Sequence, residues 1–122
     1  MKRAILIIAS ILGFFSVLIG AMGAHYFSDY LILVDRVNTF ETAVRFQFYH
    51  TFFLFFLGFS YDFTNIKLLR YAFLVCVTGI ILFSGSLYVL CLTNISFFGI
   101  ITPFGGLLLM FSWLIYLYSL MK

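Results

Sequence analysis

The sequence predicts an all-α integral membrane protein, an antiparallel bundle of four transmembrane helices with both termini in the cytoplasm. Three observations support this fold class. Of the 122 residues, 65% are hydrophobic and 9% are charged, against roughly 45–50% and 25% in an ordinary soluble domain. Four apolar runs approach the roughly 20 residues that a spanning helix needs. The Lys and Arg residues flank these runs unequally. We expect a single domain over residues 1–122, with spans near 4–24, 41–61, 71–92 and 103–120.

Composition also excludes several classes of protein. So apolar a chain is not a soluble enzyme, a disordered tail or a disulfide-bonded secreted module. The net charge of +3 comes from scattered basic residues, so no nucleic-acid partner is expected. Cys76 and Cys91 would be roughly 22 Å apart along one helix, too far for a disulfide. Neither cysteine has the spacing of a metal site, and we predict no metal and no cofactor. Both cysteines are expected to be buried as small hydrophobic residues.

The first span, residues 4–24, follows Lys2 and Arg3 as a signal peptide also would. Its apolar run exceeds the 7–15 residues typical of a signal peptide. At 100° per residue, its small side chains share one face, where a second helix can approach closely. We therefore keep the segment as a transmembrane helix. The small residues on this face are Ala9, Gly13, Ser16, Gly20, Gly23 and Ala24.

The second span, residues 41–61, carries most of the polar side chains. Asn38 and Glu41 have the spacing of a capping box at its start. Glu41 also precedes Arg45 by four residues, the favourable order for an ion pair on a helix. Tyr49 lies one turn beyond and could stack under the guanidinium. Gln47 and His50 point to other directions, which predicts that this helix contacts protein on two sides or lines a wet cavity on one.

The third span, residues 71–92, has a face of small residues that includes Gly79. Ser84 and Ser86 lie in its second half, where serines usually bond to a carbonyl one turn back or to a neighbouring helix. No nucleophile elbow or partner acid accompanies these serines, so Ser–His catalysis is not predicted. His25, at the end of the first span, is expected to cap carbonyls. His25 and His50 lack the spacing of a metal or haem site.

The fourth span, residues 103–120, is predicted to start with Thr102 as the cap and Pro103 in the first turn. Gly105 and Gly106 follow and should allow close packing. Near the far end of this span, aromatic side chains are expected to form an interfacial belt. These aromatic residues are Trp113, Tyr116 and Tyr118.

The basic residues predict the orientation. In a four-span topology, one side of the membrane holds Lys2, Arg3, Lys67, Arg70 and Lys122, and the other holds Arg36. The positive-inside rule then places both termini in the cytoplasm. The polar segments consequently gather in the non-cytoplasmic half of the bundle, where we predict a polar network. Its members are Glu41, Arg45, Gln47, Tyr49, His50, His25, Ser84 and Ser86.

Four segments carry a resemblance to a known family: Gly20–His25, Phe40–His50, Leu82–Tyr88 and Ile101–Gly106. Together they resemble the domain-of-unknown-function-423 family, also called the transmembrane protein 256 family or uncharacterised membrane protein family 0382. The resemblance covers nearly the whole chain. It implies a small four-helix protein of the bacterial plasma membrane. It does not imply a particular reaction, because no activity is established for the family.

Three functions are compatible with this sequence. The first is a structural or assembly component whose polar network orders the fold or binds a partner. The second is a transporter or channel for ions or small solutes, which would need at least a dimer because four short helices enclose little space. The third is a lipid head-group site or membrane enzyme that uses Glu41, Arg45 and His50, in which Arg45 would suit a phosphate. We favour the first and a non-enzymatic role, with the lipid bilayer and either a second copy or another membrane protein as partners.

Overall fold

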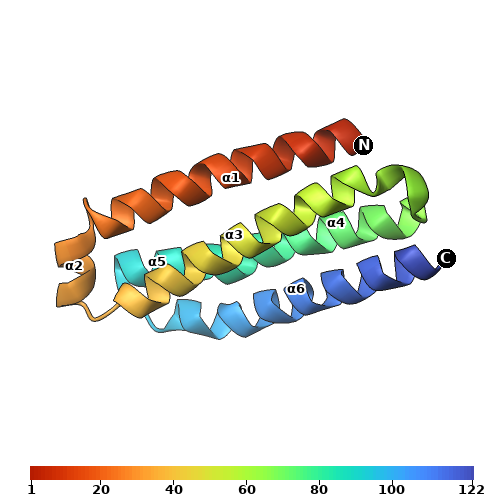
Figure 1. Ribbon diagram of the computed structural model, residues 1–122. Helices are drawn as coiled ribbons and strands as arrows, with labels where there is room; N and C mark the ends of the chain where they lie inside the picture. Colours follow the sequence, from red (N-terminus) through yellow and green to blue (C-terminus); the bar gives the residue numbers. More distant parts are fainter.

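Long antiparallel helices make up the protein, and the computed structural model describes all 122 residues (Figure 1). The long helices are α1 (Lys2–Ala24), α3 (Val37–Phe59), α4 (Ile66–Ile80) with its continuation α5 (Ser86–Thr93), and α6 (Phe97–Met121). The short elements are α2 (Ser28–Leu33), the 3-10 turn η1 (Tyr61–Phe63) and the π-helical turn η2 (Ile81–Gly85). Both termini lie at the end that holds the α3–α4 connection, which we call the terminal end. We call the opposite end the α2 end.

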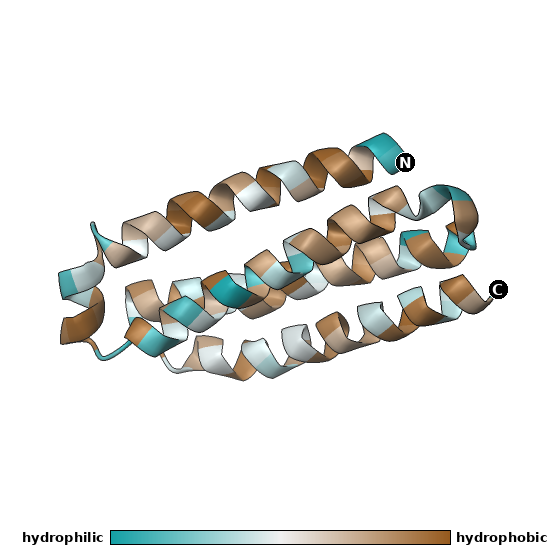
Figure 2. Ribbon diagram, in the orientation of Figure 1, coloured by the Kyte–Doolittle hydropathy of each residue, from teal (hydrophilic) through white to brown (hydrophobic).

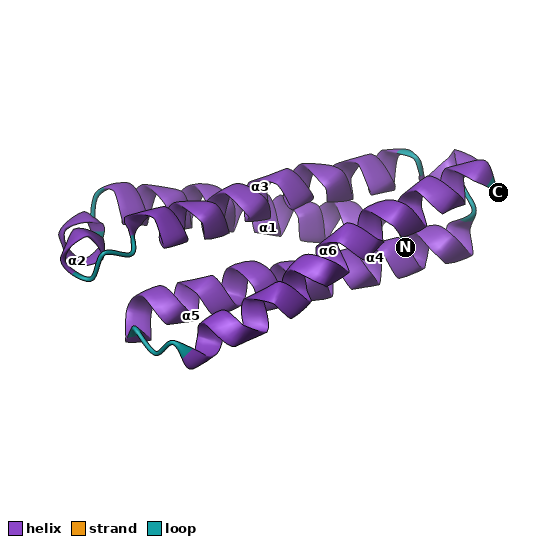
Figure 3. Ribbon diagram, turned by 90° about the horizontal axis from the view of Figure 1, so that it is seen from below, coloured by secondary structure: helices purple, strands orange, loops and turns teal.

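The long helices associate as two pairs. Helix α1 packs mainly on α3, and the continuous helix α4–η2–α5 packs mainly on α6, so that two layers are seen from below (Figure 3). Small residues make the first pair close. A Cβ atom added to Gly13 would lie 3.4 Å from the Thr51 side chain, and one added to Gly20 would lie 3.3 Å from Val44. The small-residue face of α1 therefore lies against α3, where short side chains let the helix backbones approach.

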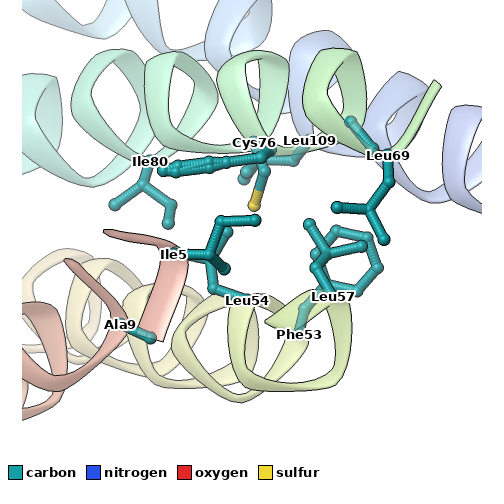
Figure 4. Packing of buried hydrophobic residues seen from close by; sticks show 11 residues of the cluster. Ile5, Ala9, Phe53, Leu54, Leu57, Leu69, Cys76, Ile80 and Leu109 are labelled. Carbon is teal, nitrogen blue, oxygen red and sulfur yellow. The ribbon is translucent and has the colours of Figure 1, made fainter. Parts of the chain in front are cut away.

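A buried apolar cluster joins the two pairs at the terminal end (Figure 4). Ile5 from α1 and Leu54 from α3 meet Cys76 from α4, and all three side chains are fully buried. Leu109 brings α6 into the same cluster. Cys91 is buried at the other end of the continuous helix, and both cysteines are free, as the sequence predicted.

Many large apolar side chains are exposed on the outside of the bundle, and hydrophobic residues occur along every long helix (Figure 2). Three helices are long and apolar enough to cross a membrane: Lys2–Ala24, Ile66–Thr93 and Phe97–Met121. Helix α3 has 23 residues, as many as α1, but its polar side chains lower its mean hydropathy, and it is not among the three. The chain is thus all-helical with three candidate spans, and the fourth span stays a prediction.

Two helix starts differ from the prediction. Helix α3 begins at Val37 without a side-chain cap, because Asp35 turns the chain in the left-handed region at φ 56° and leaves Asn38 already inside the helix. The predicted capping box is therefore wrong. Helix α6 begins at Phe97, so Thr102 is not its cap and Pro103 lies inside it. Transmembrane helices tolerate an internal proline because neighbouring groups satisfy the freed backbone.

The π-helical turn η2 lies beside the glycines of α6. A Cβ atom on Gly105 would overlap backbone atoms of α4–η2, at 2.7 Å from the carbonyl carbon of Leu82 and 2.8 Å from the Cα atom of Phe83. Gly79 is also close-packed, since its Cβ would lie 3.0 Å from the backbone nitrogen of Leu109. The two helices of this pair therefore touch backbone to backbone next to the π-turn, and π-turns are frequent at functional sites.

Candidate functional site

The polar residues of α3 divide between two faces. Gln47, His50 and Thr51 are buried. Glu41, Arg45 and Tyr49 recur every four residues and are exposed, in agreement with the helical spacing of the sequence. The predicted network is consequently two separate groups, one inside the bundle and one on its surface.

Gln47 is the centre of the buried group. Its Nε2 donates to the carbonyl oxygen of Leu12 in α1 at 3.1 Å. Its Oε1 accepts from the hydroxyl of Tyr88 in α5 at 2.6 Å. The side chain is 4% exposed, so these two bonds satisfy an amide that would otherwise be costly to bury. One glutamine thereby connects α1, α3 and α5.

His50 is held from both ring nitrogens. The Trp113 indole Nε1–H of α6 donates to His50 Nε2 at 3.0 Å. Since Nε2 accepts, Nδ1 carries the proton of the neutral ring and donates to the Phe46 carbonyl at 2.8 Å. Phe46, Phe83 and Met110 line a small apolar pocket of about 170 Å³ beside this pair. The imidazole is therefore fixed in one tautomer and has no free nitrogen.

The two serines of the third span also bond to neighbouring helices. Ser84 in η2 donates to the Ala43 carbonyl of α3 at 2.7 Å. Ser86 shares a hydrogen bond of 2.6 Å with the Thr102 hydroxyl of α6. Residues two positions apart on a helix point about 200° apart, so the two serines reach different helices. Ser–His pairing is absent, because His50 is bonded to Trp113 and each serine is bonded elsewhere.

No buried side-chain nitrogen or oxygen lacks a hydrogen-bond partner. Nor do three His, Cys, Asp or Glu side chains lie close enough together to hold a metal ion. The hydrogen bonds of the buried network join neighbouring helices.

The predicted Glu41–Arg45 ion pair is wrong. The structure contains one ion pair, in which Lys2 Nζ and Asp62 Oδ2 are 2.6 Å apart at the terminal end. Glu41 and Arg45 are both exposed and make no hydrogen bond. An exposed pair four residues apart gains only about 0.3–0.5 kcal/mol, so the helix does not enforce it. Tyr49 packs edge-on against Phe46 rather than under the guanidinium.

The remaining predicted residues lie on the surface or at the helix contacts. His25 is the C-cap residue of α1, and its backbone N–H bonds to the Ala21 carbonyl at 3.1 Å. Its side chain is exposed and makes no hydrogen bond, so the prediction that the imidazole caps carbonyls is wrong. Ser16 is buried and donates to the Leu12 carbonyl at 2.7 Å. A Cβ on Gly23 would overlap the ring of Phe40, whereas one on Gly106 would make ordinary contact with Phe83.

A pocket of about 210 Å³ lies between α1, α2 and α3 near the α2 end. Gly20, Gly23 and Ala24 form its α1 side, and Glu41 and Arg45 are its only charged residues. The apolar remainder consists of Leu31, Val37, Phe40 and Val44. The exposed charges and the small-residue face of α1 thus belong to one site.

Sequence reasoning missed Tyr88, Trp113 and Thr102 as members of the buried group. Tyr88 is the last residue of Leu82–Tyr88, one of the four segments that carry the family resemblance, so the sequence did single out its position. Trp113 was assigned to an interfacial belt, but its indole N–H bonds to His50 instead. Tyr116 likewise bonds to Ser60, at 3.0 Å. The third aromatic residue of the predicted belt, Tyr118, lies under the side chain of Lys122, whose Nζ is 5.4 Å from its ring centre.

Comparison with known proteins gives one consistent result. The profile of a family described as "Protein of unknown function (DUF423)" matches residues 19–106. A UPF0382 membrane protein of Staphylococcus haemolyticus is 36% identical over 98% of this chain and 97% of its own length. YwdK of Bacillus subtilis is 34% identical over 98% of both. The inner membrane protein YgdD of Escherichia coli is 31% identical over 92% of this chain and 85% of its own. No solved structure matches.

Proposed function

We propose a structural or assembly role in the membrane for this chain, which belongs to the DUF423 family of uncharacterised membrane proteins. The observation that carries the proposal is the complete internal bonding of the buried polar side chains. Gln47 and His50 each connect helices, and both polar atoms of each side chain are hydrogen-bonded. A bundle of this kind presents fixed surfaces to a partner. The exposed pocket with Glu41 and Arg45 is the part of the polar set that stays available.

The proposed topology has four spans, which are the three candidate spans and α3, the second of the four along the chain. Its 23 residues measure about 34 Å at 1.5 Å per residue, which covers a hydrocarbon core of about 30 Å. Its buried polar side chains are bonded within the bundle, so lipid does not have to solvate them. The two exposed charges lie in its first turns, within snorkelling reach of the headgroups. Helix α3 is therefore compatible with a membrane despite its lower hydropathy.

The proposed orientation places the terminal end in the cytoplasm and the protein in the plasma membrane. Lys2, Arg3, Lys67, Arg70 and Lys122 belong to the terminal end, and Arg36 and Arg45 belong to the half of the bundle at the α2 end. An excess of Lys and Arg marks the cytoplasmic side. The relative YgdD is named an inner membrane protein, which supports the same location.

Cysteine labelling tests this topology. In a chain whose two native cysteines are buried, Asn38→Cys is expected to react with an impermeant maleimide added to intact cells. Lys122→Cys is expected to react only after the cells are opened, because the C-terminus lies inside. Labelling of Lys122→Cys in intact cells would contradict the orientation, and labelling of both positions from the same side would contradict the four spans.

The assembly role is tested by the state of the protein at its native abundance. We expect the chain, of 14.1 kDa, to migrate on a native gel in a larger complex with a second protein in fixed ratio. Purified full-length protein in liposomes is expected to release no more of a trapped pH-sensitive dye or solute than protein-free liposomes. A lone monomer on the gel would contradict the proposal, and flux through the liposomes would favour the transporter instead.

A further inference from the structure

The pocket between α1, α2 and α3 contains two opposite charges that do not neutralise each other. Glu41 and Arg45 both line it, both are exposed, and neither takes part in an ion pair. The other basic residue nearby, Arg36, is engaged, because its Nε donates to Asn94 Oδ1 at 3.1 Å. The rest of the lining is apolar or glycine. The site thus offers one cation and one anion above an apolar wall.

The depth of the two charges follows from their positions in α3. Counted from Val37, Glu41 and Arg45 lie about 6 Å and 12 Å along the helix axis. The headgroup region occupies roughly 5–8 Å on each side of the hydrocarbon core. When a core of about 30 Å is centred on α3, about 2 Å of the helix extends beyond it at each end, so the backbones of Glu41 and Arg45 lie about 4 Å and about 10 Å inside the core. Both side chains then snorkel up to the level of the headgroups. A lipid phosphate is found at this depth.

The chemistry of the two side chains selects a headgroup. Arginine presents parallel N–H donors that match a phosphate. Glu41 accepts hydrogen bonds and favours a cation that can donate them. A primary ammonium does so, whereas a quaternary ammonium has no N–H and is usually bound by several aromatic rings. The pocket has one aromatic residue, Phe40. A headgroup without a cation would leave the Glu41 carboxylate unpaired.

The volume and walls of the pocket fit a lipid better than a free solute. At about 210 Å³ it is smaller than the roughly 300–1,000 Å³ of sites that enclose a drug-sized molecule. Val44, next to Arg45 in the sequence, gives it an apolar surface suited to the glycerol and upper acyl chain, and Leu31 and Phe40 line it toward the α2 end. Gly20 and Gly23 leave room on the α1 side. A headgroup would fill the pocket while its acyl chains remain in the bilayer.

We infer that the α1–α2–α3 pocket binds a phospholipid with a phosphoethanolamine headgroup, whose phosphate pairs with Arg45 and whose ammonium pairs with Glu41. The inference rests on the proposed topology for the depth of the site, and it deepens the proposed function by naming a lipid partner. Bound in this way, the lipid would neutralise both charges and cover the exposed end of the α1–α3 contact.

Lipid retention tests the site directly. Full-length protein in mild detergent is mixed with equal amounts of phosphatidylethanolamine, phosphatidylglycerol and phosphatidylcholine of identical acyl chains, and bound lipid is counted by native mass spectrometry. The wild type is expected to retain phosphatidylethanolamine about tenfold more than the other two. Equal retention of the three lipids would overturn the inference.

Three variants assign the roles. Arg45→Gln is expected to lower retention of phosphatidylethanolamine about tenfold. Glu41→Gln is expected to retain phosphatidylethanolamine and phosphatidylglycerol equally, because the ammonium loses its partner. Arg3→Gln, which removes an exposed arginine at the terminal end, is the matched control and should behave as the wild type. If Glu41→Gln kept the full preference while folded, as judged by its circular dichroism, the inference would be wrong.

A last arm separates a lipid from a free anion. Millimolar inorganic phosphate or soluble phosphoethanolamine should not displace the bound lipid, because neither has acyl chains to contact the apolar wall. Displacement by inorganic phosphate would overturn the lipid assignment and leave a simple anion site. Retention in micelles does not depend on a protein partner or on orientation. Equal retention therefore contradicts the lipid site alone, and a lone monomer on the native gel contradicts the assembly role alone.

Discussion

Gly105→Ala is expected to destabilise the protein by about 3 kcal/mol or more, at or above the upper end of the usual cost of overpacking. The added Cβ would lie 2.7 Å from the Leu82 carbonyl carbon and 2.8 Å from the Phe83 Cα atom. Both are backbone atoms, so no side chain can rotate away. The two helices would have to separate next to the π-turn, and the Ser86–Thr102 bond would lengthen with them. Unfolding in mixed micelles by SDS titration measures the effect.

Gly106→Ala is the matched control for this experiment. Its Cβ would make an ordinary contact with the Phe83 ring, at 3.6 Å. Alanine also has the higher helix propensity, by about 1 kcal/mol in an exposed helix. The control is therefore expected to be neutral or slightly stabilising, in contrast to the large loss of stability at the adjacent Gly105. Similar losses for both substitutions would show that the backbone contact at Gly105 is not the cause.

The helices themselves were largely predictable from hydropathy, and their starts were not. Pro103 is typical of a first helical turn, but in α6 it is an internal residue, because the apolar sequence from Phe97 to Thr102 continues the helix before it. Asn38 and Glu41 have the spacing of a capping box, but the chain already turns at Asp35, so that Asn38 lies inside the helix and does not cap it. In both cases a local pattern was correct in kind, and the neighbouring chain decided where the helix begins.

The sequence predicts which face of α3 each polar residue occupies, but it does not predict which groups these residues contact. Spacing in α3 separates Gln47 and His50 from Arg45, as the structure does. Which groups Gln47 and His50 contact depends on how neighbouring helices are rotated. The π-turn changes the rotation of the residues that follow it in the continuous helix α4–η2–α5, and no residue type in the sequence predicts a π-turn. Tyr88 and Trp113 were therefore out of reach of periodicity, although both are aromatic residues with a polar atom that seeks a partner when buried.

The Gln47–Tyr88 bond provides the second large effect, since it connects two helix pairs through one amide. Gln47→Met keeps the side-chain length and removes the bonds to both Tyr88 and the Leu12 carbonyl. Interhelical hydrogen bonds in membranes average about 0.6 kcal/mol and reach about 1.7. We expect a loss of about 2 kcal/mol for Gln47→Met and about 1 kcal/mol for Tyr88→Phe.

The double variant distinguishes a hydrogen bond from two independent packing effects. Gln47→Met leaves the Tyr88 hydroxyl without an acceptor, and Tyr88→Phe leaves the Gln47 carbonyl without a donor, so each single change includes the cost of one unsatisfied buried group. Removing both groups relieves that cost, and the double variant should lose about 1 kcal/mol less than the sum of the singles. Tyr71→Phe, at an exposed tyrosine that makes no hydrogen bond, is the matched control and should leave stability unchanged. A coupling of zero between Gln47 and Tyr88 would mean that the amide holds α1 and α3 together without help from α5.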